Sequence, residues 1–205
     1  MSLMIEKLGG RVASIWSELR PATRGLVERA LELTSGSVGA TRNLPYDARA
    51  DLELSRLLSA LDEQAAEAEI VAGSSTDNQL RHIANTCAAV LQEKTQSAEV
   101  FAQLVKRAEV LRDYARIDAL ANVLSRFAPS EVCELNRSPN QIVRALANEA
   151  LAQFPTGMLI TLLSDPVDSD IAREALRKQA NEFGSDEARQ VMNALDQSDA
   201  SEDGY

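Results

Sequence analysis

The chain has 205 residues, of which 45% are hydrophobic and 25% charged, a composition that excludes wholesale disorder. The formal net charge is −10: residues 1–50 carry seven basic and five acidic side chains, a net +2, which leaves −12 for the other 155 residues. An acidic body repels phosphate backbones, which argues against nucleic acid as a partner, and no apolar run approaches the roughly 20 residues of a membrane span.

Residues 1–46 are expected to form an N-terminal helical segment followed by a linker. The stretch RVASIWSELRPATRGLVERALEL is predicted to form two short helices broken at Pro21. The linker candidate is TSGSVGATRNLPYD, residues 34–47, which is rich in Gly, Ser and Thr. Trp16 is the only tryptophan. We expect it to pack in the core, with an exposed anchor for a protein partner as the alternative.

A long helix is predicted over residues 48–70. Its leucines and alanines form one apolar stripe, at Leu54, Leu57, Leu58, Leu61, Ala65 and Ala68. The stretches NQLRHIANTCAAVLQEK and AEVFAQLVKRAEVL, which follow, are predicted to form further helices.

The chain has a single histidine, His82, which we expect to be a partly buried structural residue. It precedes Cys87 by five residues on one predicted helix, so the two side chains point about 140° apart and cannot act as a nucleophile–base pair. The spacing leaves a pairing of His82 with Cys133 open. We expect both cysteines to be reduced and half-buried, since no amino-terminal stretch resembles a secretion signal and a cytoplasmic protein is favoured.

Too few ligating side chains are present for a zinc site, because one His and two distant Cys cannot supply four ligands. The glycine pairs near the amino terminus lack the lysine and preceding strand of a phosphate-binding loop. We therefore predict no catalytic, cofactor-binding or metal-binding residues, and no cofactor.

The carboxyl-terminal half contains a repeat. QIVRALANEALAQFP, residues 141–155, matches DIAREALRKQANEFG, residues 170–184, at an offset of 29. A fainter copy, YARIDALANVLSRFAP at residues 114–129, precedes them at an offset of 27. Each copy has one apolar helical face that ends in a Phe and is followed by a Pro or Gly. We predict three stacked helix pairs over residues 112–196, with Phe127, Phe154 and Phe183 buried at equivalent positions.

Capping patterns mark the starts of these helices. In residues 138–141 (Ser-Pro-Asn-Gln) the Ser is predicted to cap a helix that starts at the Pro, and residues 165–168 (Asp-Pro-Val-Asp) have the same form. Asp165, Asp168 and Asp170 lack the central Gly and distal Glu of a Ca²⁺ loop. We interpret these acids as helix-capping residues, because helix N-termini favour negative charge.

The stretches LLSDPVDSDIAREAL and ELNRSPNQIVRALANEAL resemble units of short HEAT-type repeats, with the pattern Leu-x-x-[Ser/Asp]-Pro-x-x-x-[Val/Ile]-Arg-x-x-x-Ala. The resemblance covers residues 112–196 and implies an all-α fold, a right-handed α-solenoid of antiparallel helix pairs whose concave face binds other proteins. The Arg of the pattern is Arg144 in one copy and Arg173 in the next, and the third copy lacks it in register. We assign residues 47–196 to this repeat domain and residues 197–205 to an acidic flexible tail.

The resemblance implies that Arg144 and Arg173 brace neighbouring units through acids and carbonyls. The alternative is that they recognise anions on the concave face. With Trp16, they are the candidate partner-binding residues.

The function that these features favour is a non-catalytic scaffold or adaptor that binds another protein. An acidic surface attracts basic segments, so we expect a partner with a basic surface, and a homodimer in which the basic N-terminal segment docks on the acidic stack is a further hypothesis. The alternative function is a small-ligand sensor or enzyme with a pocket between the N-terminal helices and the repeat stack.

Overall fold

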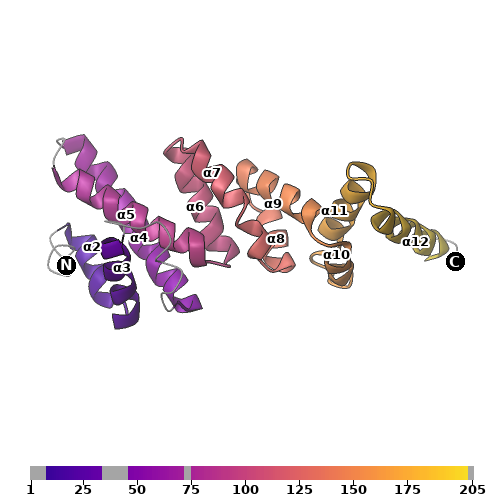
Figure 1. The fold of residues 1–205 in the computed structure, drawn as a ribbon, viewed down its shortest axis with the longest axis horizontal. Helices are drawn as coiled ribbons and strands as arrows, with labels where there is room; N and C mark the ends of the chain where they lie inside the picture. The colour runs from indigo at the N-terminus through magenta and orange to yellow at the C-terminus, as the bar shows by residue number, and fades with distance from the viewer. Residues whose placement is uncertain (1–7, 34–45, 72–74, 203–205) are drawn as a thin grey trace. The chain divides into compact units, whose positions relative to one another are not determined.

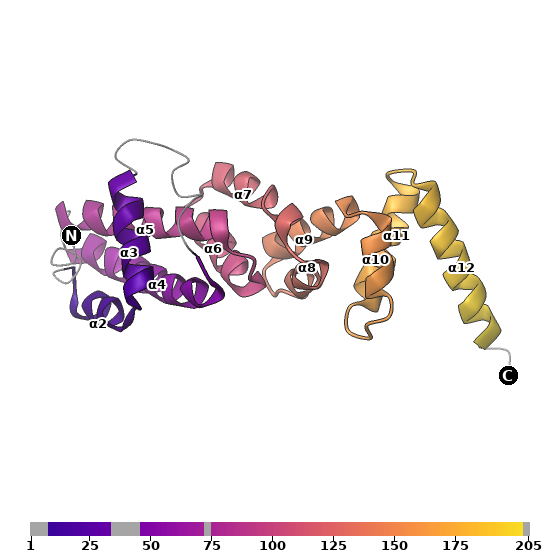
Figure 2. The same ribbon diagram turned by 60° about the horizontal axis from the view of Figure 1, so that its bottom comes forward.

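The computed structural model of the chain describes residues 8–33, 46–71 and 75–202 (Figures 1 and 2). Over these residues all regular structure is helical: eleven α-helices and one 3₁₀ helix, without a strand. The predicted all-α class is confirmed, in keeping with a chain whose apolar residues are mostly Ala and Leu, two strong helix formers. No helix in the described ranges combines the length and hydropathy needed to cross a membrane.

The described residues form two compact units, of which unit 1 ends at Thr95 and unit 2 begins at Gln96. The helices of unit 1 are α2 (Gly10–Glu18), α3 (Pro21–Leu33), α4 (Ala48–Val71) and α5 (Ser75–Lys94). Helices α4 and α5 pack against each other, α2 packs on α4, and α3 contacts both of the long helices. The predicted break at Pro21 is confirmed, while most of the predicted linker, residues 34–45, lies outside the described residues.

The apolar stripe of α4 is buried in unit 1, since Leu54, Leu57, Leu58 and Leu61 are almost inaccessible to solvent. On α2, Trp16 is completely buried. Helices α2 and α3 therefore belong to the same compact unit as α4 and α5, because they bury their apolar faces on these two long helices.

Unit 2 contains α6 (Ala98–Val110), α7 (Tyr114–Ala121), η2 (Leu124–Arg126), α8 (Pro129–Asn136), α9 (Gln141–Gln153), α10 (Thr156–Leu162), α11 (Ser169–Asn181) and α12 (Asp186–Glu202). The helices that open each pair begin at residues 114, 141 and 169, and their partners begin at residues 129, 156 and 186. Three helix pairs thus recur about every 28 residues. Helix α12 continues past residue 196, where the sequence analysis placed the start of a flexible tail.

Successive pairs are in contact along unit 2 (Figure 1). Helix α9 contacts both α8 and α11, and α10 contacts both α8 and α11. The repeat explains this packing, because equivalent positions are buried: Val143, Ala147 and Leu151 in α9, and Ala172, Leu176 and Ala180 in α11.

Polar pairs also join residues about 30 positions apart in unit 2. They are Asn140 Nδ2 to Glu109 Oε2 at 2.8 Å, Arg137 Nη1 to Asp168 Oδ1 at 2.6 Å, and Lys178 Nζ to Glu149 Oε2 at 2.9 Å. Lys178 holds the pKa of the Glu149 carboxyl below its usual range. The contacts join α6 to the start of α9, the end of α8 to the start of α11, and α9 to α11, so helix packing places polar side chains in register as well as apolar ones.

Two of the three repeat phenylalanines are buried as predicted. Phe127 is 4% exposed and Phe154 is 8% exposed, and the Phe127 ring meets the Phe101 ring edge-on at a centroid distance of 5.5 Å. Phe183 is 55% exposed, so the prediction is wrong for the last copy.

The cause is a different helix end. Phe154 precedes Pro155, which requires an extended residue before it, and its backbone is extended (φ −68°, ψ 151°). Phe127 is extended too (φ −78°, ψ 150°). Helix α11 instead ends in a left-handed turn at Gly184 (φ 67°), which leaves Phe183 at the surface.

The cap of α9 lies two residues later than predicted. Asn140 is the N-cap, and its Oδ1 accepts hydrogen bonds from the N–H groups of Ile142 and Val143 at 2.8 and 3.0 Å. The Ser138 hydroxyl accepts from the N–H of Asn140, in the preceding turn. The helix therefore starts at Gln141, because the better-placed amide oxygen satisfies its first N–H groups.

The acids before α11 have other roles than capping. Asp165 Oδ1 accepts from the N–H of Val167 at 2.8 Å, which closes a turn, and α11 begins later. Asp168 occupies the N-cap position without a capping hydrogen bond and pairs instead with Arg137. Its carboxylate is only 5% exposed, and a charged donor such as Arg137 stabilises a buried carboxylate better than a neutral donor does.

Helix α6 ends in a left-handed residue that is not glycine. Arg112 has φ 53°, the one positive φ outside glycine in the described residues. Its N–H donates to the carbonyl of Glu109, and the N–H of Asp113 donates to the carbonyl of Ala108, as in a Schellman motif. Asp113 then caps α7 by accepting from the N–H of Arg116 at 3.0 Å.

Candidate functional site

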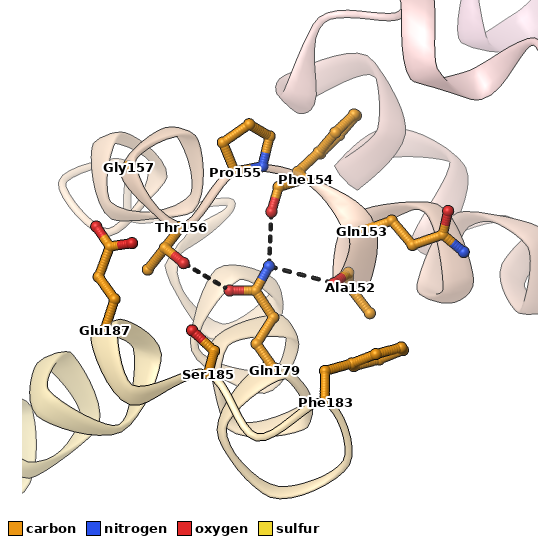
Figure 3. A pocket seen from close by; sticks show the side chains of 10 residues that line it. All are labelled: Ala152, Gln153, Phe154, Pro155, Thr156, Gly157, Gln179, Phe183, Ser185 and Glu187. Carbon is orange, nitrogen blue, oxygen red and sulfur yellow. Dashed lines mark hydrogen bonds between the residues drawn. The ribbon is translucent and has the colours of Figure 1, made fainter.

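A groove lies on unit 2 between the α9–α10 turn and the α11–α12 turn (Figure 3). Its volume is about 580 Å³. The residues that line it come from two short segments: Ala152, Gln153, Phe154, Pro155, Thr156 and Gly157 from the first, and Gln179, Phe183, Ser185 and Glu187 from the second. The groove is therefore a product of the repeat, since two equivalent helix ends form its two sides.

Gln179 connects the two sides of this groove. Its side chain is buried, and Nε2 donates to the carbonyls of Ala152 and Phe154 at 3.2 and 2.6 Å (Figure 3). The Thr156 hydroxyl donates to Oε1 of Gln179 at 3.1 Å. The last carbonyls of a helix have no intrahelical partner, so Gln179 satisfies groups that α9 leaves open.

The sequence analysis missed Gln179. In the repeat alignment Gln179 matches Ala150, which lies next to the apolar stripe. A long amide side chain at that position was the one signal that the sequence offered. A buried amide needs partners, and its partners are backbone carbonyls of another helix, which a sequence does not reveal.

Phe183 and Glu187 give the groove its exposed chemistry. Both side chains are exposed, and in Figure 3 they lie on opposite sides of Gln179. Glu187 is the single charged residue that lines the groove. The Ser185 hydroxyl is already engaged as the cap of α12, where it accepts from the N–H of Ala188 at 3.2 Å. The groove thus offers one aromatic ring and one carboxylate.

A second polar cluster lies in unit 1 around Arg20. The Arg20 guanidinium donates to both carboxylate oxygens of Asp47 at 2.7 and 2.8 Å, and its Nε donates to Glu53 at 2.8 Å. Glu53 also accepts from the Thr23 hydroxyl. These contacts raise the pKa of Arg20 and lower the pKa of Asp47. The cavity beside the cluster has a volume of only about 140 Å³, and the guanidinium and both carboxylates are already engaged with one another, so we interpret the cluster as structural.

Tyr46 and Asp51 form a further buried contact in unit 1. The Tyr46 hydroxyl donates to the Asp51 carboxylate, and burial is the main cause that raises the pKa of both groups. Hydrogen bonds from Tyr46 and Thr95 oppose this shift for Asp51. The pair holds the chain before α4 against the helix.

The predicted roles of Trp16 and His82 need correction in part. Trp16 is 0% exposed, which agrees with core packing and removes it as a surface anchor. His82 is exposed and not partly buried, because it lies on the face of α5 opposite the buried residues Ile83 and Cys87.

Both cysteines are fully buried and form no disulfide, whereas the sequence analysis expected half-buried thiols. Burial raises the pKa of Cys133 to about 12, and the nearby Asp168 carboxylate adds to the effect. A thiol with this pKa stays protonated at neutral pH and is a poor nucleophile.

The two repeat arginines occupy matching positions on α9 and α11, and both are half-buried. Arg144 Nη1 donates to the carbonyls of Ser138 and Pro139 at 2.7 and 2.9 Å. It therefore ties the start of α9 to the loop that precedes this helix, and bracing of a neighbouring unit by these arginines stays a prediction. Neither Arg144 nor Arg173 lines the groove.

No metal-binding arrangement of three or more His, Cys, Asp or Glu side chains occurs among the residues that the structure describes. The chain matches no protein-family model, and comparisons with curated proteins and with solved structures give no significant match.

Proposed function

We propose that the chain is a non-catalytic scaffold or adaptor for protein–protein interaction, in which residues 114–202 form a right-handed HEAT-like α-solenoid. The observation that carries the proposal is the succession of three helix pairs, each in contact with the next through equivalent apolar positions. Such repeats present extended surfaces, and those surfaces commonly bind other proteins.

The chemistry of the described side chains supports binding more than catalysis. The buried Cys133 has a raised pKa. At the floor of the groove, Gln179 is already hydrogen-bonded to the Thr156 hydroxyl and to the Phe154 carbonyl. His82 and Cys87 lie on α5 with one side chain exposed and the other buried. A nucleophile next to a base, which covalent catalysis requires, is thus not formed by these residues.

The charge distribution supports a basic partner. Unit 2 contains eleven basic and 18 acidic residues, a net −7, and residues 179–205 contain seven acids against one arginine. Unit 1 is also acidic, with ten basic and thirteen acidic residues. Two of the basic residues near the amino terminus are paired inside unit 1, Arg11 with Glu63 and Arg20 with Asp47 and Glu53, which favours a separate basic partner over docking of this segment on a second copy.

The test uses the full chain, because a chain that starts at residue 47 would lack the buried α2 and α3 faces. We would cross-link the full chain to its neighbours in the native cell, identify them, and reconstitute each complex from purified proteins at low and high salt. We expect a binary complex that weakens as salt rises. If no purified protein forms such a complex, the scaffold proposal is wrong, and the alternative, a small-ligand sensor or enzyme, takes its place as the hypothesis to test.

A further inference from the structure

The groove between the α9–α10 and α11–α12 turns has the features of a docking site for one kind of partner. We propose that it binds a short extended segment of a partner protein that carries an apolar side chain near a Lys or Arg. The inference rests on the proposed scaffold function and specifies the place and the chemistry of binding.

The apolar end of the site is Phe183. Its two repeat counterparts, Phe127 and Phe154, are buried, whereas more than half of the Phe183 side chain is exposed. A large exposed ring beside a groove gains free energy when a partner covers it, and aromatic residues are over-represented among the side chains that dominate binding. Phe183 is therefore the expected contact for an apolar side chain.

The charged end of the site is Glu187. Its carboxylate has no ion-pair partner among the described residues, while the neighbouring Asp186 pairs with Arg189 at 2.5 Å. The excess of acids over residues 179–205 strengthens the attraction for a cation and repels an acidic segment. A Lys or Arg is thus the complementary group.

The floor of the groove argues against a small polar ligand. The Gln179 amide already accepts a hydrogen bond from Thr156 and donates to the carbonyls of Ala152 and Phe154. These groups therefore have little hydrogen-bonding capacity left for a ligand. The same contacts hold the two sides together. The volume of about 580 Å³ is within the range of ligand sites and accommodates a few side chains of a peptide.

The probe is a set of short fluorescein-labelled peptides in which one Phe or Leu is separated from one Lys or Arg by a varied number of Gly and Ser residues. Each peptide has two controls, one with Glu in place of the basic residue and one with Gly in place of the apolar residue. Fluorescence anisotropy with the full chain gives the dissociation constants. We expect the complete peptides to bind most tightly, with affinity that decreases as salt rises.

Two variants locate the binding. Phe183→Ala is expected to weaken it about tenfold or more, and Glu187→Gln about two- to fivefold with a smaller salt dependence. Two matched controls remove an exposed ring or a charge of unit 2 outside the groove: Tyr114→Ala and Glu182→Gln. Circular dichroism and thermal melting establish that all four variants are folded.

Binding that follows Phe183 and Glu187 and ignores the two control residues supports the proposal. If the controls weaken binding as much as the groove variants do, or if no peptide binds, the groove is not the site. That result leaves the scaffold function standing when a reconstituted partner complex exists, because the complex is measured separately. Absence of any such complex, with peptide binding intact, would contradict the scaffold function alone.

Discussion

Replacing Gln179 by leucine tests whether its hydrogen bonds hold the helix pairs together. Leucine has a similar volume, so the change removes three hydrogen bonds with little loss of packing. The carbonyls of Ala152 and Phe154 and the hydroxyl of Thr156 then lose their partner. A buried polar group without a partner costs about 1–3 kcal/mol, and water from the open groove can reach some of these atoms, so we expect a loss of about 2–4 kcal/mol in the free energy of unfolding.

The assay is urea unfolding followed by circular dichroism, because the only tryptophan, Trp16, lies in unit 1 and does not report on unit 2. Thr156→Val removes one of the same hydrogen bonds, so its effect and that of Gln179→Leu should be less than additive by about 1 kcal/mol. A Gln179→Glu chain should be less stable still, since a carboxylate cannot donate to two carbonyls. A Gln179→Leu protein within about 0.5 kcal/mol of the wild type would refute the reasoning.

Three further predictions concern other positions. Phe154→Ala should cost about 3–5 kcal/mol because the ring is buried, whereas Phe183→Ala should cost less than about 0.5 kcal/mol; the same urea titration compares them, and equal losses would contradict the assigned burial. Arg112→Gly should stabilise the chain by about 0.5–1 kcal/mol, seen as a higher melting temperature, because the left-handed turn strains an arginine more than a glycine. The pKa of Asp51 is raised in the folded chain, so this carboxyl stabilises the fold at pH values below its unfolded pKa of about 4. That stabilisation is lost as the pH rises through the folded pKa. The stability of Asp51→Asn relative to the wild type should therefore increase as the pH rises above about 4 in urea titrations, and a constant difference would be inconsistent with the shift.

Much of the fold could be predicted from the sequence because helices depend on local patterns. The buried stripe of Leu54, Leu57 and Leu58 and the break at Pro21 both follow from residues within one or two helical turns. The recurrence of helices about every 28 residues followed from the repeat, and so did the burial of Phe154.

The candidate site could be predicted only in part, since it depends on how each helix ends. Phe183 was recognised as a repeat residue, but the difference between Pro155 and Gly184 after the two phenylalanines was not weighed, and it decides which ring is exposed. Gln179 and Asp168 find partners 23 to 31 residues away, and such contacts depend on the packing of helix pairs.

The polar pairs about 30 residues apart also have a mechanical consequence. Each one joins two segments of unit 2 that are about 30 residues apart in the chain, so these contacts resist the separation of those segments under tension. A helix pair of about 28 residues that gives way releases roughly 90–100 Å of extended chain. Under a steady pull, unit 2 should lengthen in steps of about that size, which single-molecule stretching would resolve. A partner bound to unit 2 would then be held by an extensible link and not by a rigid one.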